Sequence, residues 1–78
     1  MSRVKPLVRE RFKAKSTRYN VVSIRYSGEN LYEIVGIKKI GHVEHIEGIS
    51  ERLPLKLARE AIWDYADVQD GLPVLEGR

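Results

Sequence analysis

Two histidines and two glutamates lie close together in a stretch that could hold a metal ion or transfer a proton. His42, Glu44, His45 and Glu47 alternate along a segment that we expect to be a strand. Residues three apart in a strand point to opposite faces, so the two imidazoles do not converge on one metal ion. No nucleophile, oxyanion loop or phosphate-binding glycine run accompanies them. We therefore predict no metal site, no catalytic residue, no cofactor and no enzyme activity.

Basic side chains form the second candidate group, and they are concentrated early in the chain. The first forty residues contain ten Lys or Arg and three acids, whereas the last thirty-eight contain four and eight. The two parts therefore carry net charges of +7 and −4, which sum to the net charge of +3 for the whole sequence. Phosphates attract such a cluster because binding releases counterions. The candidate nucleic-acid-binding residues are Arg9, Arg11, Lys13, Lys15, Arg18, Arg25, Lys38 and Lys39. The interleaved aromatic residues Phe12, Tyr19 and Tyr26 could stack on unpaired bases if they are exposed.

Trp63 is the third candidate, because on a helical wheel it points away from the apolar face of its helix. Tryptophan next to arginine is typical of a protein-binding hot spot. The candidate protein-interface residues are Trp63, Arg59, Glu60, Asp64 and Asp67. The pattern leaves a second interpretation open, in which the C-terminal tail or the N-terminal segment covers the indole.

Alternating apolar and polar residues predict the strands that position these groups. Val22, Ile24 and Tyr26 share one side of a strand that begins near Tyr19, and Val21, Ser23 and Arg25 share the other. A loop at 27–30 follows, then strands at 31–40 and 42–49. Gly36 interrupts the second of these strands, where we predict a β-bulge. We also expect Tyr32 and Ile34 to face the core.

A helix is predicted over 50–68. Pro54 suits its first turn, where a missing N–H costs little, and Gly71 is placed to end it. The apolar face that should lie on the sheet comprises Leu57, Ala58, Ala61, Ile62 and Tyr65.

The first eighteen residues have three possible structures that the sequence does not separate. Val4, Leu7, Val8 and Phe12 are spaced for one face of a helix. Alternation between Arg9 and Lys15 instead suits a strand with one cationic face. Pro6 and the dense charge also suit a flexible arm.

Length and composition set the class of protein. A chain of 78 residues has room for one small domain, and it contains no cysteine for disulfides or thiolate sites. We divide it into a basic segment (1–18), antiparallel strands (19–49), a helix (50–68) and a tail (69–78). We predict an α+β fold, in which a three- to four-stranded antiparallel sheet carries one C-terminal helix on one face. No signal peptide or membrane span is expected, so we predict a soluble cytoplasmic protein.

The charge pattern predicts a non-enzymatic binding module that contacts nucleic acid, either DNA or RNA, through its basic N-terminal half. The alternative is a small protein-interaction module or inhibitor, similar in size and plan to phage anti-host and anti-CRISPR proteins. It would dock on a larger protein or nucleoprotein complex through Trp63 and the charges beside it. In either case we expect a monomer or a small homo-oligomer.

Overall fold

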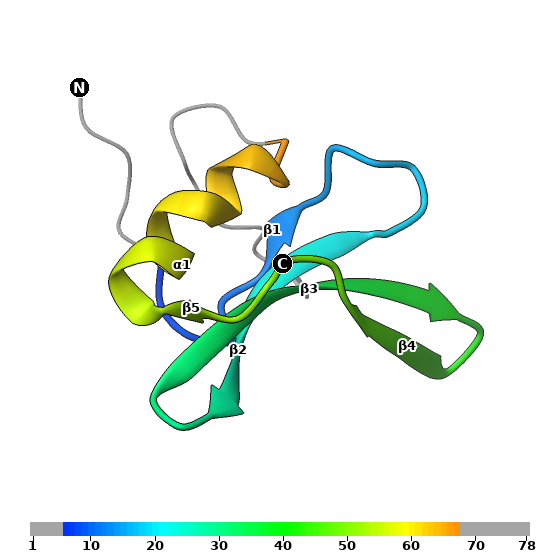
Figure 1. Cartoon of the computed structure of the whole chain (residues 1–78). Coiled ribbons are helices and arrows are strands. Elements are labelled where there is room, and N and C mark those ends of the chain that lie inside the picture. Colours follow the sequence, from blue (N-terminus) through cyan, green and yellow to red (C-terminus); the bar gives the residue numbers. More distant parts are fainter. Residues whose placement is uncertain (1–5, 68–78) are drawn as a thin grey trace.

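The computed structural model describes residues 6–67. Five strands form one antiparallel sheet in the order β1-β2-β3-β4, and β5 pairs with the beginning of β3 (Figure 1). The elements are β1 (Phe12–Lys13), β2 (Val21–Gly28), β3 (Leu31–Ile40), β4 (Val43–Gly48), β5 (Leu53–Pro54), helix α1 (Leu55–Ala61) and the 3₁₀ helix η1 (Ile62–Asp64). Helix α1 packs against β3, which confirms the predicted α+β fold. None of these helices is long and apolar enough to cross a membrane.

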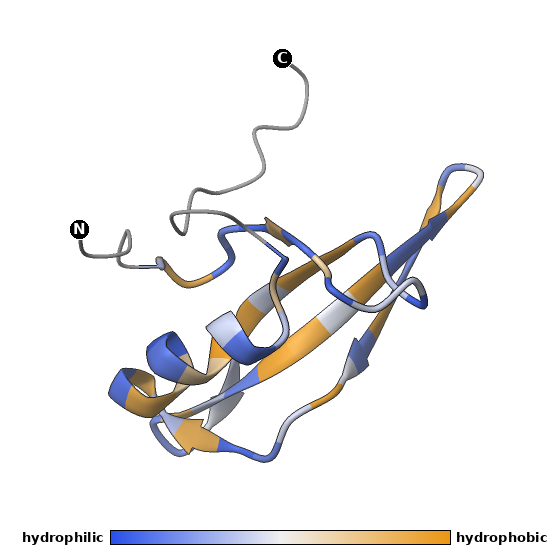
Figure 2. Ribbon diagram, turned by 90° about the horizontal axis from the view of Figure 1, so that it is seen from above, coloured by the Kyte–Doolittle hydropathy of each residue, from blue (hydrophilic) through white to orange (hydrophobic). Residues whose placement is uncertain are grey.

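Alternation along β2 and β3 gives the sheet two different faces. Apolar residues lie along the strands of the sheet and on the helix (Figure 2). On one face, Ile24 and Ile34 are partners across the strands and pack with Ala58 and Ile62 beneath the helix. We call this the helix face. The other face carries a smaller buried cluster of Val21, Val35 and Ile37. The predicted division of β2 into two sides and the inward position of Ile34 are confirmed.

A two-residue turn connects β2 to β3. Glu29 and Asn30 have positive φ angles of 57° and 60°, as a type I′ hairpin turn requires. The strand register shifts between Tyr26 and Gly28, just before this turn. The predicted bulge at Gly36 is therefore wrong, because Gly36 pairs regularly with Val22 and Glu47.

Gly36 has a different role, which is to make room for an aromatic ring. A Cβ atom built on Gly36 would lie only 2.6 Å from the nearest ring carbons of Tyr19. The missing side chain thus allows the Tyr19 ring to lie directly on the backbone of β3.

The helix is shorter than predicted at its start. It begins at Leu55 rather than near Ser50, and the two residues before it form β5. Pro54 disfavours helical backbone at the residue before it, so Leu53 stays extended and pairs with Tyr32. The Ser50 hydroxyl oxygen also accepts a hydrogen bond from the Ile34 N–H at 2.8 Å, which fastens the incoming chain to β3.

The helix also ends early, at Ala61, and continues only as η1. Ala66 then pairs with Ala14, and the Asp67 N–H donates to the Lys13 carbonyl oxygen at 2.7 Å. This extended pairing replaces the last turns of the predicted helix. Leu57, expected on the core, is 47 % exposed. Gly71 and the tail at 69–78 lie outside the described residues.

The basic segment contains a strand, but a very short one. Phe12 pairs with Val22 and Lys13 pairs with Val21. Before β1, Arg9 has a φ of 73°, and its N–H donates to the Ile24 carbonyl oxygen at 2.9 Å. Residues 9–14 are therefore held along the edge of β2, which favours the predicted strand over the helix for this part of the segment.

Candidate nucleic-acid interface

Strand register gathers five of the eight basic candidates on the sheet face opposite α1. Lys13 pairs with Val21, and Arg25 pairs with Glu33. Lys39 lies two residues beyond Ile37, on the same side of β3. Arg9 and Arg11 line the same concavity as Arg25. We call this surface the basic face, comprising Arg9, Arg11, Lys13, Arg25 and Lys39. The predicted alternation thus puts Arg9, Arg11 and Lys13 on one side of the sheet, whereas Lys15 lies outside this face.

Arg11 reaches across the basic face to β4. Its guanidinium donates two hydrogen bonds to the Glu44 carboxylate, at 2.7 and 2.9 Å. This bidentate pair lowers the pKa of Glu44 below its ordinary value, first through the hydrogen bonds from Arg11, against a smaller desolvation effect. Arg11 is therefore partly neutralised within the protein.

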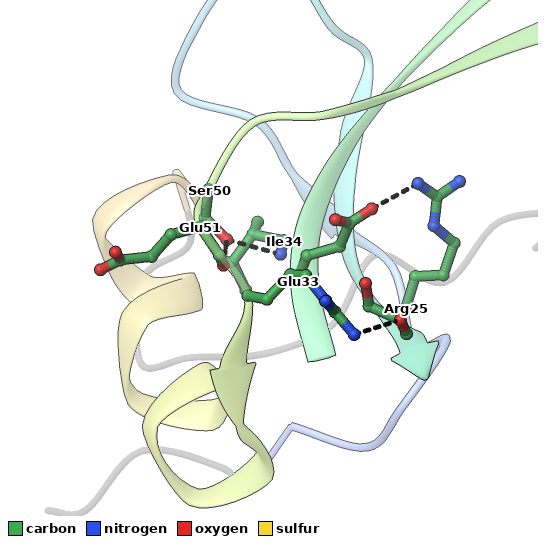
Figure 3. Close-up of polar contacts among 7 residues, drawn as sticks. Arg25, Glu33, Ile34, Ser50 and Glu51 are labelled. Carbon is green, nitrogen blue, oxygen red and sulfur yellow. Dashed lines mark hydrogen bonds and ion pairs between the residues drawn. The ribbon is translucent and has the colours of Figure 1, made fainter. Parts of the chain in front are cut away.

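Arg25 forms the second cross-strand pair on this face, with Glu33 of β3 (Figure 3). The Glu33 carboxylate lies over Gly48, where an added Cβ would come within 3.1 Å of it. The guanidinium of Arg25 remains half exposed while the Glu33 side chain is mostly covered. A phosphate can therefore approach Arg25 from solvent without displacing Glu33.

Three arginines surround a shallow apolar concavity on the basic face. Its volume is about 480 Å³, and Val35, Ile37 and Ile46 contribute apolar lining. Ser23, buried there, donates a hydrogen bond to the Glu10 carbonyl oxygen at 2.8 Å, which ties the segment before β1 to β2. Within residues 6–67, Arg9 and Lys13 form no ion pair. These two side chains are thus the most available to an external anion.

Lys15 and Arg18 lie elsewhere, in the segment between β1 and β2. They line a second concavity of about 490 Å³ with Tyr19 and Tyr65, and the carboxylates of Glu47 and Asp64 also border it. We call this the tyrosine pocket. The Arg18 guanidinium is 5.9 Å from the centre of the Tyr19 ring, near the limit of a cation–π contact.

Tyr19 is fixed in the pocket by contacts at its ring and its hydroxyl. The ring rests on Gly36, and the hydroxyl donates to Glu47 Oε2 at 3.0 Å. Burial of the phenol raises its pKa, and the hydrogen bond to Glu47 raises it further. The phenol therefore stays protonated at neutral pH and continues to donate to Glu47.

The other aromatic candidates are placed differently. Phe12 is fully buried, so it is not available for stacking. Tyr26 is 53 % exposed and contacts the edge of Tyr32 with ring centres 5.2 Å apart. Lys38 is half-buried on the helix face, across from His45. Tyr19 and Tyr26 thus each share a concavity with basic candidates. Tyr19 lies with Lys15 and Arg18, and Tyr26 lies with the three arginines of the basic face.

Trp63 packs inside the fold rather than standing alone on the surface. Its ring contacts Phe12 edge to face, with centres 5.0 Å apart. Phe12 of the N-terminal segment therefore covers part of the indole, and the C-terminal tail, the other cover considered, lies outside the described residues. Arg59 is half-buried, and its Nε atom is buried with no hydrogen-bond partner in the described chain. Glu60, Asp64 and Asp67 are exposed.

The histidine and glutamate stretch forms β4. Across residues 6–67, no group of three or more His, Cys, Asp or Glu side chains is arranged to hold a metal ion. Glu44 and Glu47 instead bind Arg11 and Tyr19, respectively.

Sequence reasoning missed the roles of Tyr65 and Glu47 in the tyrosine pocket. The sequence places Tyr65 on the apolar face of the predicted helix, and it suggests Glu47 only as part of the histidine and glutamate stretch. The interrupted strand at Gly36 was the available signal, since a glycine in a strand can mark the close approach of another group. Which group approaches it depends on tertiary structure.

Comparisons with protein-family models, curated proteins and solved structures gave no match. The site is therefore interpreted from its own geometry and charge.

Proposed function

We propose that this protein is a non-enzymatic module that binds nucleic acid in the cytoplasm through phosphate contacts on the basic face. The observation that carries the proposal is the register, which puts Lys13, Arg25 and Lys39 on one side of the sheet beside Arg9 and Arg11. A phosphate backbone presents regularly spaced negative charges, and a broad cationic surface matches it without reading base sequence. DNA and RNA both satisfy this chemistry.

The two carboxylates on this face reduce its positive charge but leave enough of it to bind phosphates. Glu44 and Glu33 form ion pairs with Arg11 and Arg25. Arg9, Lys13 and Lys39 are exposed and are not in an ion pair among the described residues. We expect these three to provide most of the phosphate contacts.

Docking through Trp63 receives less support, because the indole packs on Phe12. A hot-spot side chain must be available to the partner, and this ring already contributes to the protein's own core.

The test is the salt dependence of binding to a labelled oligonucleotide. In the double variant Arg9→Gln, Lys13→Gln, affinity should fall for all sequences alike. The slope of log K against log salt should flatten by about one per lost contact.

The matched control compares Lys13→Gln with Lys56→Gln, since each removes one positive charge but Lys56 is exposed on α1. Only the first should weaken binding appreciably. Equal slopes in the wild type and the double variant would refute the proposal.

A further inference from the structure

The tyrosine pocket has features that contact with phosphates alone does not require. Two aromatic rings, two cations and two carboxylates border one concavity of about 490 Å³. That volume falls within the usual range for small-ligand sites. The members of the tyrosine pocket that carry the argument are Lys15, Arg18, Tyr19, Glu47, Asp64 and Tyr65.

Backbone pairing holds the two sides of the pocket in place. The Lys15 N–H donates to the Tyr65 carbonyl oxygen at 2.9 Å, next to the Ala14–Ala66 pair. At the other end of this segment, the Asn20 N–H donates to the Ile37 carbonyl oxygen at 2.8 Å. The pocket is therefore preformed, which lowers the entropic cost of binding.

The Tyr19 ring is positioned like a stacking platform. One part of it rests on Gly36, and the hydrogen bond to Glu47 fixes its orientation. Arg18 lies near the ring at 5.9 Å and is exposed, so its long side chain can move to admit a planar ligand or stack upon it. Tyr65 contributes a second ring to the same concavity.

The charges around these rings match the other parts of a nucleotide. Lys15 and Arg18 are exposed cations that can contact a phosphate. The exposed Asp64 carboxylate can accept a hydrogen bond from an N–H on the edge of a base, as acidic side chains do with amino groups of bases. A planar group that has N–H donors and is attached to a phosphate can contact the aromatic, cationic and acidic side chains of the pocket at the same time.

We infer that the tyrosine pocket takes one unpaired nucleobase of a nucleic acid strand, so that the bound nucleic acid is single-stranded at this point. This inference rests on the proposed function and names its ligand class. Bases inside a duplex are stacked and paired and cannot enter such a pocket, whereas splayed bases of single strands stack readily on aromatic side chains. Lys15 and Arg18 then belong to the contact of that one nucleotide. The pocket lies on the helix face, lined by Val22 and by Tyr19 on Gly36, so a bound strand reaches the basic face by passing around the β1 edge of the sheet, from Lys15 to Lys13.

The experiment compares three probes of equal length with the intact protein. They are an oligothymidylate of about ten nucleotides, which suits the site size of small single-strand binders, the same strand with abasic sites, and a duplex. The single strand should bind about fivefold to a hundredfold more tightly than the abasic strand, as loss of base stacking predicts. Because the abasic probe keeps its phosphates and changes nothing in the protein, this comparison does not depend on the folding of a variant.

Matched variants then locate the effect. Tyr65→Leu should lose most of the preference for the intact strand over the abasic one, while Tyr65→Phe should keep it. The thermal midpoint of each variant gives the control for folding. A nucleoside monophosphate should compete only weakly, because it lacks the phosphates that reach the basic face.

The outcomes separate this inference from the function on which it rests. If all three probes bind alike with the same salt dependence, the inference is overturned and phosphate binding remains. If none binds at low salt, the proposed function itself fails. If the free monophosphate binds as tightly as the strand, the pocket is a site for free nucleotides and the inference is also overturned.

Discussion

Single residues decide how much of the positive charge is available to a ligand. Arg11 and Arg25 have the same charge as Arg9, yet each is held by a carboxylate on a neighbouring strand. Arg11 and its partner Glu44 are 33 positions apart, so spacing along the sequence gives no sign of this pair. A list of candidate cations can therefore be made from the sequence, but their ranking depends on the register of the strands.

The Arg11–Glu44 pair should make stability depend on pH. The pKa of Glu44 is lowered in the folded state, mainly by the hydrogen bonds from Arg11. A lowered folded pKa stabilises the protein above the ordinary glutamate value, and this contribution is lost as the pH falls through the folded value. In urea unfolding at pH 7, Glu44→Gln should be less stable than wild type. The two should converge only at acidic pH, as the pH falls below the ordinary glutamate pKa and through the lowered folded pKa of Glu44.

Glu60→Gln is the control for this titration, since Glu60 is exposed on α1 and forms no ion pair within the described chain. Its difference from wild type should change much less between the two pH values. A constant difference between Glu44→Gln and wild type across the range would show that the pair has no effect on stability.

Between the secondary-structure elements, one aromatic contact joins β1 to η1, the 3₁₀ helix that follows α1. Phe12 of β1 is fully buried and meets Trp63 of η1 edge to face. The helical wheel placed Trp63 outside because a wheel considers only the side of the helix that faces the sheet. The indole is instead contacted by Phe12, which β1 brings against η1.

We expect Trp63→Ala to destabilise the fold rather than only to remove a binding contact. The indole is half-buried, so its loss should lower the free energy of unfolding by about 2–3 kcal/mol, somewhat less than for a fully buried ring. Trp63→Phe should retain much of this stability, because a smaller ring can still contact Phe12. Chemical denaturation followed by circular dichroism measures both. An unchanged unfolding midpoint in Trp63→Ala would mean that the contact with Phe12 is not important for stability.

The strands were predictable because alternation is a local signal. Val22 and Ile24 point one way and Val21 and Ser23 the other, as their order in the sequence requires. The limits of the helix were not predictable in the same way. They depend on Leu53 pairing with Tyr32 at one end and on Ala66 pairing with Ala14 at the other. Tertiary pairing overrode local helix propensity at both ends.

For the whole molecule, the separation of charge along the sequence becomes a partial separation between the two sides of the sheet, because Glu33 and Glu44 lie among the cations of the basic face. Cations from β1, β2 and β3 share the basic face, while Glu60 and Asp64 are exposed on the helical layer. Packed layers are about 10 Å apart, which is close to the Debye length at 0.1 M salt. Charges on one side are therefore largely screened from a phosphate bound on the other.

This separation predicts that oligonucleotide affinity depends more on the position of a charge than on the net charge of the protein. Glu44→Gln and Glu60→Gln each raise the net charge by one, but only Glu44 lies beside Arg11 on the basic face. At pH 7, Glu44→Gln should tighten oligonucleotide binding by roughly threefold and steepen the salt dependence, since one screened surface charge contributes up to about 1 kcal/mol. Glu60→Gln should change both by much less. Titrations of both variants with the oligonucleotide, over the same range of salt, measure the two changes. Equal gains in affinity would mean that the ligand responds to total charge and that the basic face is not its binding surface.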